Sequence, residues 1–229
     1  AQPFKSSGMM LTCRKDMGVN STDDLKGKTL GVWFYGNEYP FLSWMSRLGL
    51  ATDGSADGVT VLKQGWGVEP LTEGQAACVS TMSYNEYWVV RDAGYSPEQL
   101  TVFKYQAEGA ATLEDGLYVL EKNLGDSNFQ DKMVRFVRAS MKGWKYAEAN
   151  PKEAASIILD NDDAGVQTEK HQVRMMGEIA KLTAGSNGAL DPADYQRTVK
   201  VLMSGASDPV ITKEPSGAWT HDITNAALN

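Results

Sequence analysis

Short apolar runs alternate with amphipathic stretches through the first half of the chain. Five runs rich in apolar and β-branched residues predict strands, at 9–15, 29–34, 59–64, 77–82 and 100–104. Three intervening stretches predict helices, at 21–27, 39–48 and 84–93. Strands that alternate with helices at this spacing predict an α/β fold with a mainly parallel sheet covered on both faces.

After Leu120 the pattern changes to a series of capped amphipathic helices. The longest apolar stripe consists of Phe129, Met133, Phe136, Val137, Met141 and Trp144. We expect Ser127 to cap this helix and Asn150-Pro151 to end it and begin the next. Further helices are predicted at 168–183, from 191 through 202, and at 223–228. The sheet is already covered by its own helices, so these stripes need another partner.

Composition and charge exclude several classes of protein. The 229 residues are 42% hydrophobic and carry a formal net charge of -7. No basic run marks a surface for nucleic acid or for an anionic membrane, so we expect neither as a partner. The longest apolar runs fall far short of the ~20 residues that a membrane-spanning helix needs.

Candidate residues for catalytic or metal chemistry are few. His171 and His221 are the two histidines, and no HExxH pattern or nucleophile elbow is present. Residues 160–171 begin like a calcium-binding loop but end on His171, where a bidentate Glu is needed. Gly65-Trp66-Gly67 begins a dinucleotide fingerprint, but Pro70 stands where its third glycine belongs. We therefore expect no catalytic residues, no cofactor and no metal site.

Two cysteines, Cys13 and Cys78, lie 65 positions apart. This spacing excludes a CxxC redox pair, a thiolate zinc site and a disulfide scaffold. A single disulfide and two buried free thiols both remain open.

Aromatic and amide side chains gather where two predicted strands pass into helices. The eight candidate ligand-binding residues are Tyr35, Gly36, Asn37, Glu38 and Tyr39 after one strand, and Thr81, Tyr84 and Asn85 after another. In an open α/β sheet, ligands bind at the carboxyl ends of the strands. Ring faces and amide dipoles suit a small planar heterocycle. The alternative for the first cluster is a tight turn in which Glu38 stabilises the helix dipole.

Three segments carry a resemblance that extends along nearly the whole chain. They are 23–32 (DDLKGKTLGV), 35–39 (YGNEY), and 136–144 (FVRASMKGW) followed by 149–155 (ANPKEAA). These segments resemble the NMT1/THI5-like family of periplasmic substrate-binding proteins of ABC importers, which is related to the binding of thiamine pyrimidine precursors. The first and third segments are common among receptors for nitrate, sulfonates and pyrimidines, and only the second favours pyrimidines.

The resemblance implies two α/β lobes of the periplasmic-binding-protein type II, joined by two crossovers, with the ligand between them. It places a first crossover at 1–7, a second lobe at 8–105, a second crossover at 106–118, and C-terminal helices at 119–229 that would pack on the first lobe. Family members begin with a first-lobe sheet that this sequence does not contain. We therefore expect exposed helix faces and self-association of the chain on its own.

The function implied by the resemblance is that of a periplasmic or lipid-anchored receptor that delivers a small heterocycle to a membrane permease. The alternatives are a pyrimidine-synthase-like enzyme of the same fold, or a receptor for a flavin, a sulfonate or nitrate. Such synthases use a first-lobe histidine and a cysteine-rich iron motif, which have no counterpart here. In the family's topology strands 9–15 and 77–82 are neighbours, which permits a Cys13–Cys78 bond without requiring it.

Overall fold

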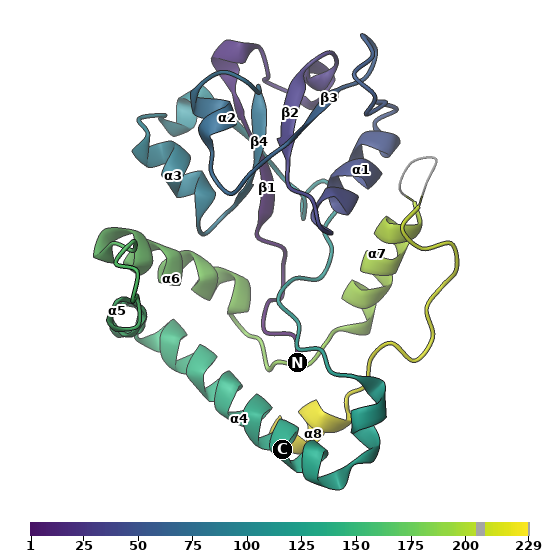
Figure 1. Cartoon of the computed structure of the whole chain (residues 1–229), viewed down its shortest axis with the longest axis vertical. Helices are drawn as coiled ribbons and strands as arrows, with labels where there is room; N and C mark the ends of the chain where they lie inside the picture. Colours follow the sequence, from purple (N-terminus) through teal and green to yellow (C-terminus); the bar gives the residue numbers. More distant parts are fainter. Residues whose placement is uncertain (205–208, 229) are drawn as a thin grey trace. The chain divides into compact units, whose positions relative to one another are not determined.

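Five strands form one mixed sheet in the computed structural model, which describes residues 1–204 and 209–228. In chain order they are β1 (Met9–Arg14), β2 (Thr29–Val32), β3 (Thr60–Lys63), β4 (Cys78–Met82) and β5 (Leu100–Lys104). The spatial order is β3-β2-β4-β1-β5 (Figure 1). β2 pairs in parallel with β3 and β4, whereas β1 is antiparallel to β4 and β5. Four strands thus run in one direction and β1 runs in the other.

Helices cover both faces of this sheet (Figure 1). On one face, α1 (Glu38–Arg47) buries Phe41, Trp44 and Met45 against β1 and β2. On the other face, α2 (Glu69–Thr72) and α3 (Glu86–Asp92) bury Leu71 and Val90 against β4 and β5. Each fully buried side chain of this size contributes about 1.5–3 kcal/mol of transfer free energy. Both faces are therefore dry, as the alternating pattern predicts.

The predicted strands are all present, with bounds that differ by at most two residues. The helix predicted at 21–27 is a single 3-10 turn, Thr22–Leu25, whose capping box joins Ser21 and Asp24. Two further 3-10 turns flank the sheet, at Lys15–Met17 and Pro97–Gln99. These turns are too short for an apolar stripe, so their caps define them.

The second half of the chain is helical. After a 3-10 turn at Glu121–Gly125 it contains α4 (Ser127–Ala149), α5 (Pro151–Asp160), α6 (Glu169–Thr183), α7 (Pro192–Met203) and α8 (Asp222–Leu228). Ser127 is the first helical residue of α4 and not its cap. The cap is Asp126, whose carboxylate accepts a hydrogen bond from the Asn128 backbone N–H. The predicted α4–α5 junction at Asn150-Pro151 is confirmed.

The chain divides into two compact units. The helical unit comprises Ala1–Ser7, Leu113–Gln196 and Pro215–Asn229, and the sheet unit comprises Gly8–Thr112 and Arg197–Glu214. Within the helical unit, Val137 and Met141 of α4 pack against Ala227 of α8. Ala154, Ala155 and Met176 join α5 to α6. Three of the six residues of the apolar stripe of α4, Val137, Met141 and Trp144, therefore have partners inside their own unit.

Cys13 and Cys78 form a disulfide between β1 and β4. They face one another in the antiparallel register, and neither residue is exposed. Of the two arrangements that the sequence leaves open, the structure has the bonded one.

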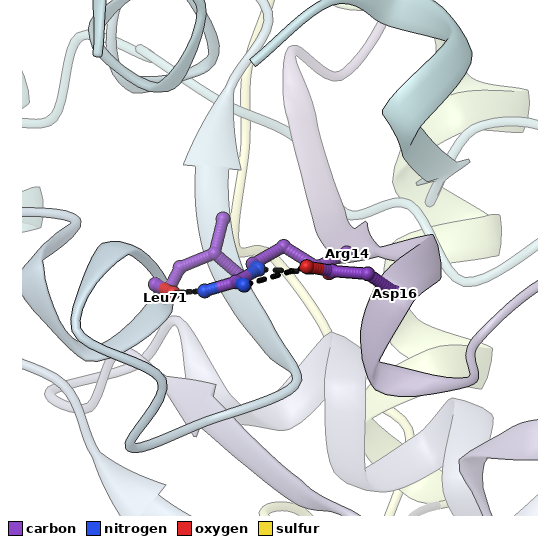
Figure 2. A network of polar contacts seen from close by, with 3 residues as sticks. All are labelled: Arg14, Asp16 and Leu71. Atoms are coloured by element: carbon purple, nitrogen blue, oxygen red, sulfur yellow. Dashed lines mark hydrogen bonds and ion pairs between the residues drawn. The ribbon is translucent and has the colours of Figure 1, made fainter. Parts of the chain in front are cut away.

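Arg14 is the last residue of β1, and its side chain contacts Asp16 and Leu71 (Figure 2). Its Nε and Nη2 donate to the two carboxylate oxygens of Asp16 at 3.0 and 2.7 Å, and its Nη1 donates to the Leu71 carbonyl at 3.0 Å. The guanidinium also lies over the Tyr95 ring, 5.1 Å from its centroid. The paired Arg14 holds the pKa of Asp16 below its usual value. The guanidinium of Arg14 thus connects the end of β1 both to Asp16 and to α2.

Among the described residues, no helix is both long enough and apolar enough to cross a bilayer.

Candidate functional site at the carboxyl edge of the sheet

Three adjacent strands end at one edge of the sheet. β3, β2 and β4 lie side by side and run in the same direction, with Val32 opposite Lys63 and Gly31 opposite Val79. The loops 33–37, 64–68 and 83–85 follow them directly. Both predicted clusters therefore lie on the same edge, where α/β proteins bind ligands.

The loop after β2 presents an aromatic ring to solvent. Tyr35 is 92% exposed and has a φ of 65°, and Gly36 follows at 112°. Positive φ at two consecutive residues turns the chain sharply, and glycine tolerates this freely. One carboxylate oxygen of Glu38, Oε2, accepts a hydrogen bond from the Gly36 N–H at 2.7 Å. Asn37 is exposed, whereas Tyr39 is half-buried.

A cation and a second exposed ring come from the end of β3. The Lys63 ammonium lies 4.8 Å from the Tyr35 ring centroid and 5.3 Å from that of Phe34. Trp66 is 96% exposed, and the neighbouring Gly65 carbonyl accepts a hydrogen bond from the Trp33 indole at 2.9 Å. Lys63 and Trp66 were not among the site residues predicted from the sequence. A tryptophan between two glycines directly after a predicted strand was the available signal.

Buried Gln64 joins the loops to one another. Its amide nitrogen donates to the carbonyls of Gly67 and Ser80, and its amide oxygen accepts from the Ser80 N–H at 2.8 Å. Because β2 separates β3 from β4, the Gln64 side chain must pass over β2. It passes at Gly31, where a Cβ atom would lie 3.2 Å from the Gln64 amide oxygen. Gly31 thus makes room for the polar bridge beneath the site.

The loop after β4 is less open than expected. Thr81 is fully buried, and its hydroxyl lies 2.7 Å from that of Thr12 on β1. Tyr84 and Asn85 are partly buried. The Asn85 amide donates to Glu86 at 2.7 Å, and the other Glu86 oxygen accepts from the Met82 N–H. Burial raises the pKa of Glu86 above its usual value, although these hydrogen bonds oppose the shift.

The edge thus combines two exposed aromatic rings, one ammonium group and partly buried polar groups. It brings Tyr35, Gly36, Asn37 and Glu38 to one loop and Tyr84 with Asn85 to another. Thr81 lies beneath the surface. No group of three His, Cys, Asp or Glu side chains among residues 1–204 and 209–228 is arranged to hold a metal ion. The arrangement suits recognition by stacking and hydrogen bonding.

A model of one protein family matches residues 1–154, which is more than half of the chain, and its description is NMT1/THI5 like. A search of curated proteins found no match.

Solved structures give a further comparison. A protein from Bordetella bronchiseptica RB50 aligns with 99% of this chain and 72% of its own, at 16% identity and a TM-score of 0.63. This likeness shows a shared fold. With the strand order and the helical second half, it confirms the expected class, an α/β lobe whose strands run mainly in one direction, followed by C-terminal helices.

Two more structures align with 45% of this chain. One comes from work on glutathione import through the cystine ABC importer of Streptococcus mutans, at 14% identity and a TM-score of 0.34. The other is an ancestral arginine-binding protein bound to arginine, at 19% identity and a TM-score of 0.30. The chain spans 42% and 43% of their respective lengths.

Proposed function

This chain belongs to the NMT1/THI5-like family, and we propose that it acts as part of a substrate-binding receptor for an ABC importer. Its sheet unit would be a lobe of the periplasmic-binding-protein type II. The observation that carries the proposal is the shared edge of β3, β2 and β4, where Tyr35 and Trp66 expose almost all of their surface. Exposed rings at the carboxyl ends of parallel strands favour a ligand with a flat face.

The proposed ligand is a small planar heterocycle such as a thiamine pyrimidine precursor. Tyr35 and Trp66 would stack on its ring, and the Lys63 ammonium would place a positive charge beside it. Glu38 has one oxygen on the Gly36 N–H, and its other oxygen can accept a hydrogen bond from an exocyclic amino group. Tyr84 and Asn85 would contact the ligand from the neighbouring loop, while buried Thr81 supports β4 from below.

Transport, and not catalysis, is the role we assign to this site. Closure of two lobes would expel water from the ligand, with segments 1–7 and 106–118 as the crossovers, and the closed form would be presented to a membrane permease. We place the receptor in the periplasm or on the outer side of the cell membrane. Absorbance of iron or of a bound organic cofactor in the purified protein would favour the synthase-like enzyme instead.

Titration calorimetry with a 4-aminopyrimidine tests the ligand class, with riboflavin, an alkanesulfonate and nitrate as competitors. We expect the pyrimidine to bind and the sulfonate and nitrate not to bind. Loss of a stacking ring costs about 1–3 kcal/mol. Trp66→Ala and Tyr35→Ala should therefore each weaken binding by about 5- to 150-fold.

Tyr146→Ala is the matched control, because Tyr146 is an exposed ring on α4 in the helical unit. Unchanged pyrimidine affinity in both site variants would remove this edge from the binding site. Tight binding of riboflavin with no binding of the pyrimidine would replace the ligand class while keeping the site.

A further inference from the structure

Helix α4 concentrates positive charge in a chain that is acidic overall. The chain has a formal net charge of -7. The 23 residues of α4 nevertheless contain five basic side chains and only two acidic ones. The basic ones are Lys132, Arg135, Arg138, Lys142 and Lys145, and all five residues are exposed. At 3.6 residues per turn they fall along one side of the helix.

A neighbouring side of α4 packs into the core of the helical unit. Val137 and Met141 are buried against Ala227 of α8, and α8 lies along α4 in Figure 1. Arg138 also serves this contact, because its guanidinium donates to the carbonyls of Ala226 and Ala227 at 2.9 and 3.0 Å. Packing therefore fixes which side of α4 faces solvent.

Most of the exposed cations are not neutralised. Arg135 pairs with Asp131 at 3.1 Å. In the part of the chain that the structure describes, Lys132, Lys142 and Lys145 have no carboxylate within ion-pair distance. Three lysine ammonium groups on one side of the helix are thus available to attract anions.

One aromatic ring lies on the same side of the helix as these cations. Tyr146 follows Lys142 by four positions and is 45% exposed, and the exposed residues Ala139 and Gly143 carry no long side chain. We name the surface formed by Lys132, Lys142, Lys145 and Tyr146 the basic face. Basic residues mixed with aromatic ones are typical of helices that lie in the headgroup region of a bilayer.

We propose that the basic face binds the surface of an anionic lipid bilayer. From Lys132 to Lys145 the row of cations is about 20 Å long, at 1.5 Å per residue. Long, flexible lysine side chains spread along such a row suit a flat, fluid array of headgroups. The Tyr146 ring would enter the headgroup layer while the lysines contact phosphate groups. The residues of the proposed ligand site lie in the sheet unit, so the two proposals fail or succeed separately.

Co-sedimentation with vesicles tests this surface. We expect the full chain to bind vesicles of equimolar phosphatidylglycerol and phosphatidylcholine at low salt, and to be released by about 0.5 M NaCl. Pure phosphatidylcholine vesicles should bind little. Each lysine near an anionic membrane changes binding about fivefold. The triple variant Lys132→Gln/Lys142→Gln/Lys145→Gln should therefore bind about a hundredfold more weakly.

The control is a second triple variant, Lys15→Gln/Lys26→Gln/Lys104→Gln, which removes the same charge from exposed positions of the sheet unit. It should retain most of the binding. Equal losses in the two variants, or no binding of the unaltered chain to anionic vesicles, would overturn the proposal. Concentration-dependent association of the protein alone that only the first variant abolishes would assign the face to a second copy of the chain instead.

Discussion

Gly31 shows how one missing side chain supports the candidate site. A Cβ atom there would lie 2.9 Å from a Val79 methyl and 3.2 Å from the Gln64 amide oxygen. We expect Gly31→Ala to lower the free energy of unfolding by about 1–3 kcal/mol, because overpacking displaces the Gln64 bridge. Urea denaturation measures this change. Gly65→Ala is the matched control, since a methyl group there would meet no atom within 4 Å; an equal loss there would contradict the explanation.

Glu86 gives the site a specific pH dependence. Burial raises its pKa in the folded protein. The folded state therefore binds the Glu86 proton more tightly than the unfolded chain does, and this term lowers stability as the pH rises between the two pKa values. Glu86→Gln removes the term. In urea denaturation, the free energy of unfolding of the variant minus that of the unaltered chain should be larger at about pH 7 than at about pH 4. A constant difference at both pH values would contradict the raised pKa.

At the same scale, the sequence predicted part of the geometry of the candidate site. Tyr35, Gly36 and Glu38 form the exposed turn that a strand-to-helix transition predicts. Thr81 differs because strand alternation and the pairing with β1 turn its hydroxyl toward Thr12. Trp66 and Lys63 lie at the candidate site because β3 pairs with β2, and this pairing of distant segments cannot be read from local residue patterns.

Helix boundaries were more predictable, because capping chemistry is local. Asn150-Pro151 and Thr168 mark helix ends in the structure as they do in the sequence. The cap of α4 was displaced by one residue because Asp126 and Ser127 are both good caps, and the aspartate is used. The basic face gives no signal in the sequence for a different reason. Its lysines, at positions 132, 142 and 145, form no run in the sequence, and only the helix places them on one side.

Arg138 controls the contact between α4 and α8. It donates two hydrogen bonds to the last carbonyls of α8, where a cation also interacts favourably with the helix dipole. We expect Arg138→Gln to lower the free energy of unfolding by about 1–2 kcal/mol and to speed amide hydrogen exchange in α8. Arg135→Gln is the control, because exposed Arg135 pairs with Asp131 of its own helix and should cost less than about 0.5 kcal/mol. Equal exchange rates in the two variants would contradict this role.

For the molecule as a whole, the alternating pattern predicted the fold class, but not the reversed direction of β1. Strand direction depends on where the chain enters the sheet, and β1 comes directly after the segment assigned to the helical unit. That reversal has a chemical consequence. It places Cys13 opposite Cys78 in an antiparallel pair, so the covalent bond joins two neighbouring strands near the middle of the sheet.

The disulfide is expected to contribute strongly to global stability. It closes a loop of 65 positions, and cross-links of this kind typically stabilise a protein by about 2–4 kcal/mol. The double variant Cys13→Ala/Cys78→Ala should lose this amount in urea denaturation. Without denaturant, a mild reductant should act slowly on the unaltered chain, because neither cysteine is exposed.

Thiol counting on denatured, unreduced protein checks the bond directly, and we expect no free thiol. Reduction under denaturing conditions should then release two. If the bond provides the stability, the reduced chain and the double variant should unfold at similar urea concentrations, since both lack the cross-link. Two free thiols before reduction would contradict the bond. An oxidised chain no more stable than the reduced one would show instead that the packing of β1 against β4 suffices, because the dry core already holds these strands together.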